Sequence, residues 1–279
     1  MNIAGNIISW TPPPSMSKTL FRERLRDCGL DPLMAGQLGV KTAFNRACSK
    51  LPDSRIIRQI YSSDKEIFYQ FTTEENTGSE ILYSKEADVT LDKETGRVSI
   101  NSDKDLTRVV AELNVNTEKY LGTYLGHDMT VCIDRIFKTQ GDLFPIKPRT
   151  SFYFVPIHHE ALMKRVKTFV ESIEGKWIGL PVPNGSEGFG TVCEAVEQGL
   201  LDVIKEYEEA VLEFNPDTKG FVMERMIEKI KLAKFKTESY GMFLGSNEKE
   251  LQNRIKVVQE ILEKKVELIL DEPAITGVS

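Results

Sequence analysis

The pattern of apolar and polar residues along this chain is clearest in its middle, at residues 151–183. One apolar run, Phe152–Val155, stops at Pro156, and a second, Trp177–Val182, stops at Pro183. Between the two runs, apolar residues recur at helical spacing: Leu162, Val166, Phe169, Val170 and Ile173. The pattern predicts a strand, a helix and a second strand. Two strands joined in this way normally lie parallel in one sheet, with a right-handed crossover.

The first 52 residues predict short elements. Residues 1–14 end in three prolines, which favour an extended segment, and we interpret them as a tail. Residues 15–52 predict a cap of three short helices. The second of these starts at Asp31-Pro32, a capping residue followed by proline, and reaches Gly36–Gly39.

Residues 53–183 predict an α+β core. Short apolar runs between Arg55 and Asn101 alternate with polar residues, and the turn at Asp92–Gly96 is typical of a hairpin. We therefore expect an antiparallel meander with one packed face. A helix capped by Asp103 and a longer helix from Thr117 to Lys138 follow.

The chain after Pro183 is predicted to be helical. The glycine-rich segment 184–190 is interpreted as a hinge, residues 191–271 as a helical arm and residues 272–279 as a tail. The last helix carries a narrow apolar seam at near-heptad spacing, typical of a coiled coil: Leu251, Ile255, Val258, Leu262, Val266 and Ile269. We expect the seam to pair chiefly with Thr191–Phe214, in an intramolecular bundle or with a remainder that binds a protein partner or a second copy.

The predicted fold class is thus α+β. It comprises an N-terminal helical cap, a mostly antiparallel sheet with the central strand–helix–strand unit, and a C-terminal helical arm.

Charge is unevenly distributed along the chain. The formal net charge is −6, yet residues 1–58 carry nine Lys/Arg against four Asp/Glu, and the rest carries 27 against 38. A basic segment on an acidic body can mark contact with nucleic acid. Residues 18–58 are therefore a candidate nucleic-acid surface.

The composition excludes several classes of protein. No apolar stretch approaches the ~20 residues of a membrane helix, and the N-terminus lacks the basic residues of a secretory signal. The four cysteines, Cys28, Cys48, Cys132 and Cys193, form no C-x-x-C pair. We expect reduced, buried thiols, no membrane association and a cytoplasmic protein.

Few residues suggest catalysis. His158 and His159 are adjacent, and neighbours on a helix point about 100° apart, so they are not expected to share a metal ion. His127-Asp128 resembles an acid–base pair without a nucleophile. The loop Gly185–Gly190 precedes a helix, as phosphate-binding loops do, but lacks the lysine of a P-loop. We therefore assign no catalytic residue, metal or cofactor.

The stretch 34–47, with Leu-Gly-Val at its centre, resembles the helix-turn-helix of phage repressors of the Cro type. In that family the second helix enters the major groove. The resemblance implies DNA contacts by Lys41, Thr42, Asn45 and Arg46.

The motifs SFYFVP-x₄-LMKRVKTFVESI and LGVKTAFNRAC resemble a family of phage and prokaryotic proteins of about this length without a known activity. The leading hypothesis is a non-enzymatic interaction or adaptor protein of a phage or prokaryotic mobile element, which binds a protein partner through its arm. The alternatives are a DNA-binding protein acting through its basic N-terminal helices and a nucleotide-binding enzyme using Gly185–Gly190.

Overall fold

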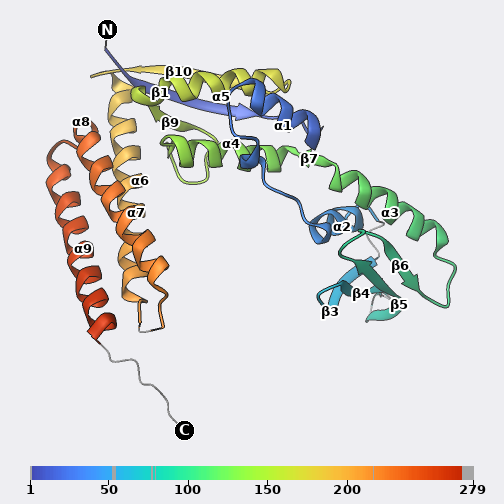
Figure 1. Ribbon diagram of the computed structural model, residues 1–279. Helices are drawn as coiled ribbons and strands as arrows, with labels where there is room; N and C mark the ends of the chain where they lie inside the picture. Colours follow the sequence, from blue (N-terminus) through green and yellow to red (C-terminus); the bar gives the residue numbers. More distant parts are fainter. Residues whose placement is uncertain (1, 52–54, 77, 79, 216, 272–279) are drawn as a thin grey trace. The chain divides into compact units, whose positions relative to one another are not determined.

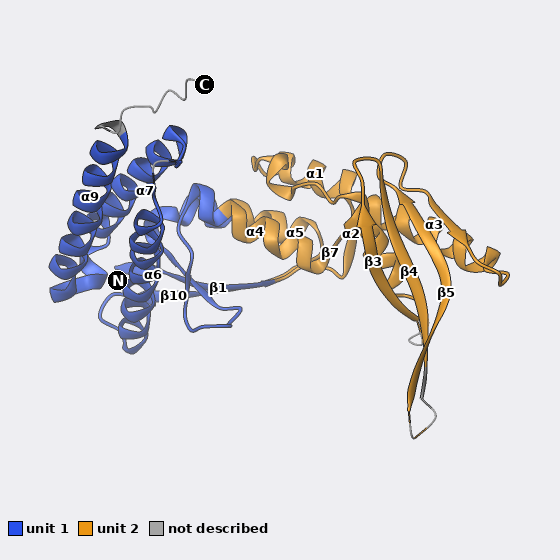
Figure 2. Cartoon of the chain, turned by 90° about the horizontal axis from the view of Figure 1, so that it is seen from below, with its two compact units in different colours: residues 1–10, 137–164, 177–279 blue, residues 11–136, 165–176 orange. Residues whose placement is uncertain are grey.

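The computed structural model describes residues 2–51, 55–76, 78, 80–215 and 217–271. The chain forms two compact units, each assembled from separate stretches of sequence (Figure 2). Unit 1 comprises residues 1–10, 137–164 and 177–279, and unit 2 comprises residues 11–136 and 165–176. These boundaries differ from those expected at residues 14, 52 and 183, because each unit packs segments that are far apart in the sequence.

Unit 1 contains a four-stranded sheet in the order β10-β1-β9-β8 (Figure 1). Its strands are β1 (Ile3–Thr11), β8 (Phe144–Pro145), β9 (Tyr153–Pro156) and β10 (Lys176–Pro183). β9 pairs antiparallel with both β1 and β8. β1 and β10 also run antiparallel, since the Asn184 amide donates to the Asn2 carbonyl at one end (2.9 Å). At the other end, Gly175 lies beside the Thr11 carbonyl.

The predicted strand–helix–strand unit is confirmed. It consists of β9, the 3-10 turn η2 (Ile157–His159), α5 (Glu160–Ser172) and β10. β9 and β10 are parallel, as expected, but β1 lies between them. The predicted tail is therefore wrong for most of its length. Gly5 permits this insertion, because a Cβ there would stand 2.3 Å from the Val155 carbonyl oxygen.

The C-terminal part of unit 1 is helical, as predicted. Its elements are α6 (Glu187–Leu212), α7 (Gly220–Ser239), α8 (Gly241–Leu244), the 3-10 turn η3 (Gly245–Asn247) and α9 (Glu248–Asp271). α6, α7 and α9 lie side by side (Figure 1), and their apolar faces form one core. Residues 272–279, the predicted C-terminal tail, lie outside the described residues.

The helices and the sheet of unit 1 share that core. Ala4, Phe144, Phe154 and Val182 of the sheet belong to the same buried cluster as the apolar residues of α6, α7 and α9. The segment expected to be a hinge starts α6 at Glu187. A separation of core and arm at residues 184–190 is therefore not what the structure shows, because both sides bury the same apolar surface.

Unit 2 contains the predicted antiparallel meander, in the order β3-β4-β5-β6. The strands are β3 (Arg55–Ser62), β4 (Glu66–Asn76), β5 (Ile81–Asp92) and β6 (Val98–Asn101). Gly96 has a φ of 72°, as its place in the hairpin turn requires. One face of the sheet packs on α2 (Val40–Cys48) and α3 (Thr107–Leu121), with which it shares an apolar core. The expected alternation of a packed and a wet face is confirmed by Ile67, Tyr69 and Phe71, all buried.

The rest of unit 2 contains β2 (Ser15–Ser17), α1 (Lys18–Asp27), the 3-10 turn η1 (Pro32–Ala35), β7 (Thr123–Leu125) and the first part of α4 (Gly126–Gln140). The single helix predicted for residues 117–138 is wrong. Helix α3 ends with its C-cap at Gly122, β7 then pairs with β2, and α4 follows. The reason is Tyr124, which is buried against Phe21 and donates a hydrogen bond to the Gly36 carbonyl (2.7 Å).

The four cysteines are free, as predicted. Cys48 and Cys132 are buried, and burial raises the pKa of each thiol to about 12. Cys28 and Cys193 are only half-buried, so the expectation of burial is confirmed for two of the four. None of the helices among the described residues combines the length and the apolar composition needed to cross a membrane.

Candidate functional site

The residues proposed to contact DNA lie on α2. Lys41, Thr42 and Asn45 are exposed there, whereas Arg46 is half-buried. The Arg46 guanidinium donates two hydrogen bonds to the carboxylate of Asp128, at 2.8 and 2.6 Å. Three of the four side chains are thus free to meet solvent, and the fourth is committed to an ion pair inside unit 2.

The segment before α2 does not form the first helix of a helix-turn-helix. Residues 31–48 are all described, and the expected helix from Asp31 is the single 3-10 turn η1. Gly36 follows with a φ of 67°, which ends the turn. Residues 36–39 are then non-helical, and α2 begins at Val40. The expectation of a helix reaching Gly36–Gly39 is therefore wrong.

The apolar seam of α9 lies largely inside unit 1. Leu251, Ile255, Val258 and Leu262 are buried in the common core, and Val266 packs at its margin. α9 contacts α7 as well as α6, so its pairing is not chiefly with residues 191–214 as expected. Ile269 is half-buried. Binding of a partner through these six residues stays a prediction.

His127 and Asp128 do not form an acid–base site. Besides its bonds to Arg46, the Asp128 carboxylate accepts a hydrogen bond from the Leu125 amide (2.8 Å) at the start of α4. His127 is exposed. The carboxylate is therefore a structural anchor for a helix start.

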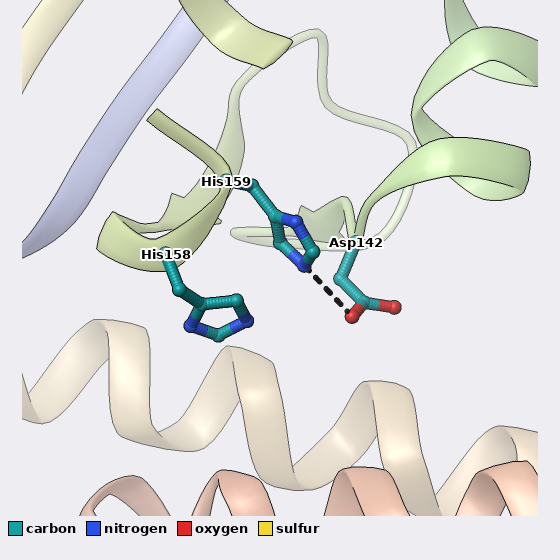
Figure 3. A group of neighbouring side chains, drawn as sticks. All are labelled: Asp142, His158 and His159. Carbon is teal, nitrogen blue, oxygen red and sulfur yellow. Dashed lines mark hydrogen bonds and ion pairs between the residues drawn. The ribbon is translucent and has the colours of Figure 1, made fainter. Parts of the chain in front are cut away.

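A second cluster, which the sequence reasoning did not identify, lies within unit 1. It brings together Asp142 from the loop after α4, His158 and His159 from η2, and Lys236 and Tyr240 from the end of α7. Buried Pro156 ends β9 and starts η2, which presents both histidine rings to the same side (Figure 3). Their ring centroids are 4.2 Å apart.

Asp142 is the centre of this cluster. Its Oδ2 atom accepts a hydrogen bond from the Tyr240 hydroxyl (2.5 Å) and lies 3.2 Å from His159 Nε2, while Oδ1 accepts one from the Lys236 ammonium. The Tyr240 hydroxyl also lies 3.0 Å from His158 Nε2 and 3.4 Å from His159 Nε2. All five polar groups therefore belong to one network.

Packing holds the members of the network in place. The Tyr240 ring is buried, meets Phe144 edge to face at 5.5 Å and stacks on His158 at 5.2 Å. Gly141 lets the Asp142 loop approach η2, because a Cβ at Gly141 would stand 2.8 Å from Leu162 and 3.4 Å from the His159 ring. The site is thus built by backbone approach as well as by hydrogen bonds.

The protonation states follow from these surroundings. Burial raises the pKa of the Asp142 carboxyl, but hydrogen bonds from His159, Lys236 and Tyr240 outweigh burial, so this pKa lies below its ordinary value. Burial, followed by the neighbouring His159, lowers the pKa of His158. Burial and the Asp142 carboxylate raise the pKa of Tyr240. At neutral pH Asp142 is therefore ionised, His158 is neutral and Tyr240 is a donor.

The cluster faces a pocket of about 460 Å³. Its walls are residues 138–142, the two histidines and the C-terminal half of α7, where Leu232 and Phe235 contribute apolar surface. Their exposed fractions are 51% and 65%. The pocket combines two imidazoles, a carboxylate, an ammonium group and a phenol with an apolar rim. Such a set can bind a cation or move a proton, and its rim can contact an apolar ligand.

The sequence held one signal for this site, the adjacent histidines after Pro156. The prediction assumed α-helical geometry, whereas His158 and His159 lie in a 3-10 turn and turn their rings towards one neighbour. Asp142 and Tyr240 lie 98 residues apart, and no spacing along the chain relates them.

The described residues thus define a mixed α+β protein of two units, one with a polar cluster at a pocket. The model of a family of unknown function (DUF6744) matches residues 5–270, and the chain belongs to that family. No curated protein and no solved structure matches the chain.

Proposed function

We propose that this chain is a non-enzymatic interaction protein and that its partner docks on the outward face of α7. The observation that carries the proposal is the outward row of α7, defined by residues spaced four and three apart: Phe221, Arg225, Glu228, Leu232, Phe235 and Ser239. All are exposed, and Phe221, Leu232 and Phe235 present 56%, 51% and 65% of their surface. They lie opposite the buried side of the helix, marked by Met226 and Ile230.

Exposed apolar side chains on one helical row are typical of an interaction surface, since a solvated row is normally polar. Single exposed apolar residues need no explanation. Here, however, Leu232 and Phe235 are adjacent on the row and also form the rim of the pocket. Leu232 and Phe235 therefore join the outward row of α7 to the rim of the pocket.

The charge of α7 indicates the chemistry of the partner. α7 carries five Lys/Arg against three Glu, whereas α6 carries one lysine against seven acidic residues. Lys231 and Lys234, next to Leu232 and Phe235, are exposed. The partner that complements this surface is an amphipathic helix with an apolar face and acidic flanks.

A direct test uses three synthetic amphipathic helices that share one Leu/Phe face and carry Glu, Gln or Lys on their polar face. Fluorescence anisotropy measures the binding of each to the full chain at low and near-physiological salt. We expect the acidic helix to bind most tightly and to weaken with salt. Replacing Leu232 and Phe235 together by Ser should weaken it at least about tenfold.

Leu268→Ser is the matched control, because Leu268 is 69% exposed on α9. It should leave binding of the acidic helix unchanged. Equal binding of the three peptides, or of the acidic peptide to the double variant and the parent, would contradict the proposal.

Nucleic-acid binding is the alternative proposal. What supports it is the exposure of Lys41, Thr42 and Asn45 on α2 and the basic surplus of residues 1–58. Phosphate contacts would make the affinity fall steeply with salt. If neither duplex nor single-stranded DNA binds at low salt, this alternative is excluded.

Two further hypotheses stay predictions. A phage or mobile-element origin rests only on the resemblance of the motifs. Nucleotide binding at Gly185–Gly190 would raise the melting temperature by a few degrees at saturation. We expect no such shift with common nucleotides.

A further inference from the structure

The polar cluster of unit 1 has the spacing of a metal-coordinating set. Four donors about 2.0–2.1 Å from one tetrahedral ion stand about 3.3 Å apart. His159 Nε2 and Asp142 Oδ2 are 3.2 Å apart, close to that separation. No two of the donor atoms of Asp142, His158 and His159 are more than 4.8 Å apart.

We propose that Asp142, His158 and His159 bind a single divalent transition ion of the zinc type, while the Tyr240 hydroxyl keeps its hydrogen bond to the ligating Asp142 carboxylate. Two imidazole nitrogens and one carboxylate oxygen form a borderline donor set, which suits such ions better than the oxygen-binding Mg²⁺ or Ca²⁺. The site goes beyond the proposed docking function and does not depend on it.

The donors differ in how far they must move. His159 and Asp142 already stand at the separation that a shared ion requires. His158 is exposed at the pocket, where its ring stacks on Tyr240. Tyr240 is buried and stacked, and only its hydroxyl reaches the cluster. Asp142 and His159 therefore form the prepared part of the site, and His158 completes it.

Lys236 is the group that opposes an ion here. Its ammonium donates a hydrogen bond to the Oδ1 atom of Asp142. The Oδ2 atom, which accepts a hydrogen bond from Tyr240, is left for the proposed ion. A hydrogen bond to the outer oxygen of a ligating carboxylate is usual in metal sites. The positive charge nevertheless repels a cation, so Lys236 should weaken the affinity of a site that it also orients. Lys236→Gln keeps a hydrogen-bond donor and removes the charge.

The test is a titration of the untagged, chelator-treated full chain with Zn²⁺, followed by calorimetry, and with Co²⁺ as a visible-absorption reporter of four-coordinate geometry. We expect one ion per chain and an affinity that falls as the pH is lowered, because protons compete with the ion for the imidazole nitrogens. Asp142→Asn and His159→Gln should each weaken binding more than about 100-fold, since outer-shell changes alone cost about 10–100-fold. Lys236→Gln should tighten it several-fold.

His127→Gln is the matched control, because His127 is exposed and belongs to unit 2. It should bind Zn²⁺ like the parent. His158→Gln is the second variant if the more buried substitutions unfold the chain, and circular dichroism decides that point. The proposal is overturned if the parent shows no saturable binding at micromolar Zn²⁺, or if folded His158→Gln binds as the parent does.

Discussion

Each unit holds a buried carboxylate, and the two are satisfied in different ways. Among the residues that the structure describes, the Glu86 carboxylate in unit 2 has one partner, Arg55, whose guanidinium donates to its two oxygens at 2.6 and 2.7 Å. Asp142 in unit 1 has three partners. Tyr240 and His159 contact its Oδ2 atom, and Lys236 contacts its Oδ1 atom. Their side chains are 6% and 13% exposed, so both carboxylates are largely shielded from solvent.

The pKa of both carboxyls lies below the ordinary value. For Glu86 the hydrogen bonds from Arg55 are the main cause, whereas for Asp142 burial acts first and its three donors outweigh it. A shifted pKa alone therefore does not mark a functional site. What distinguishes Asp142 is that its hydrogen-bond partners are three separate side chains at a pocket, whereas one guanidinium binds both oxygens of Glu86.

The strongest test of this comparison is a substitution that places a carboxylate without a partner in a buried position. Val258→Asp would create one in the core of unit 1, where Val258 is 1% exposed. We expect a loss of at least about 4 kcal/mol, with the sheet unfolding together with the helices because they share one core. Tryptophan fluorescence during urea unfolding reports on unit 1, since the two tryptophans, Trp10 and Trp177, both lie there.

Val257→Asp is the matched control, because Val257 is the adjacent residue and is 52% exposed. It should change stability little. Limited proteolysis of Val258→Asp provides the opposing outcome: release of a stable fragment ending near residue 185 would show that the sheet folds without the helices.

The second largest effect should follow removal of Arg55, the partner of Glu86. Arg55→Met leaves that carboxylate buried and uncompensated, and we expect a loss of about 3 kcal/mol. Far-UV circular dichroism in urea measures it. The exposed pair Lys85–Asp88 serves as control, since Lys85→Met should cost less than about 1 kcal/mol. Equal effects of the two substitutions would show that the Arg55 fork is not a structural anchor.

A smaller effect is expected where the carboxylate keeps other donors. Lys236→Met leaves Asp142 bonded to Tyr240 and His159, so the loss should be about 1.5 kcal/mol. Exposed Lys234→Met is the control, with little effect. A loss as large as that of Arg55→Met would mean that Lys236 is the sole support of the carboxylate and that the cluster is a closed ion pair.

The smallest effects concern pH. The lowered pKa values of Asp142 and Glu86 mean that their contributions are complete above the unfolded values of about 3.9 and 4.3 and are lost as pH falls through the folded values. Lys236→Met should move the acid limb of unit 1 unfolding to higher pH, because it removes a cause of the Asp142 shift. Circular dichroism and tryptophan fluorescence, recorded between acid and neutral pH, measure this unfolding in the parent and in Lys236→Met.

His158 contributes with the same sign in a higher pH window. Its pKa is lowered on folding, so the unfolded chain binds the proton more readily and stability is lost as pH falls from about 6.5 to the folded pKa. His158→Gln should remove this slope, while His127→Gln should retain it. A slope that survives His158→Gln would show that other groups produce it.

Local patterns in the sequence were sufficient wherever one segment determines its own geometry. The hairpin at Gly96, the helical period of α5 and the heptad seam of α9 were all predicted from spacing, because helix and strand periods follow from backbone geometry. The α+β class followed from the order of these elements.

Tertiary structure decided where those segments meet. Nothing in residues 1–14 shows that β1 will enter between β9 and β10, since the partners of an extended segment lie in the other strands. Tyr124 breaks a helical pattern because a buried place for its ring exists only in the folded unit. The Asp142 cluster arises in the same way: its carboxylate, imidazoles and phenol come from three separate elements, and only the packing of α7 against η2 and the Asp142 loop brings their donor atoms within bonding distance.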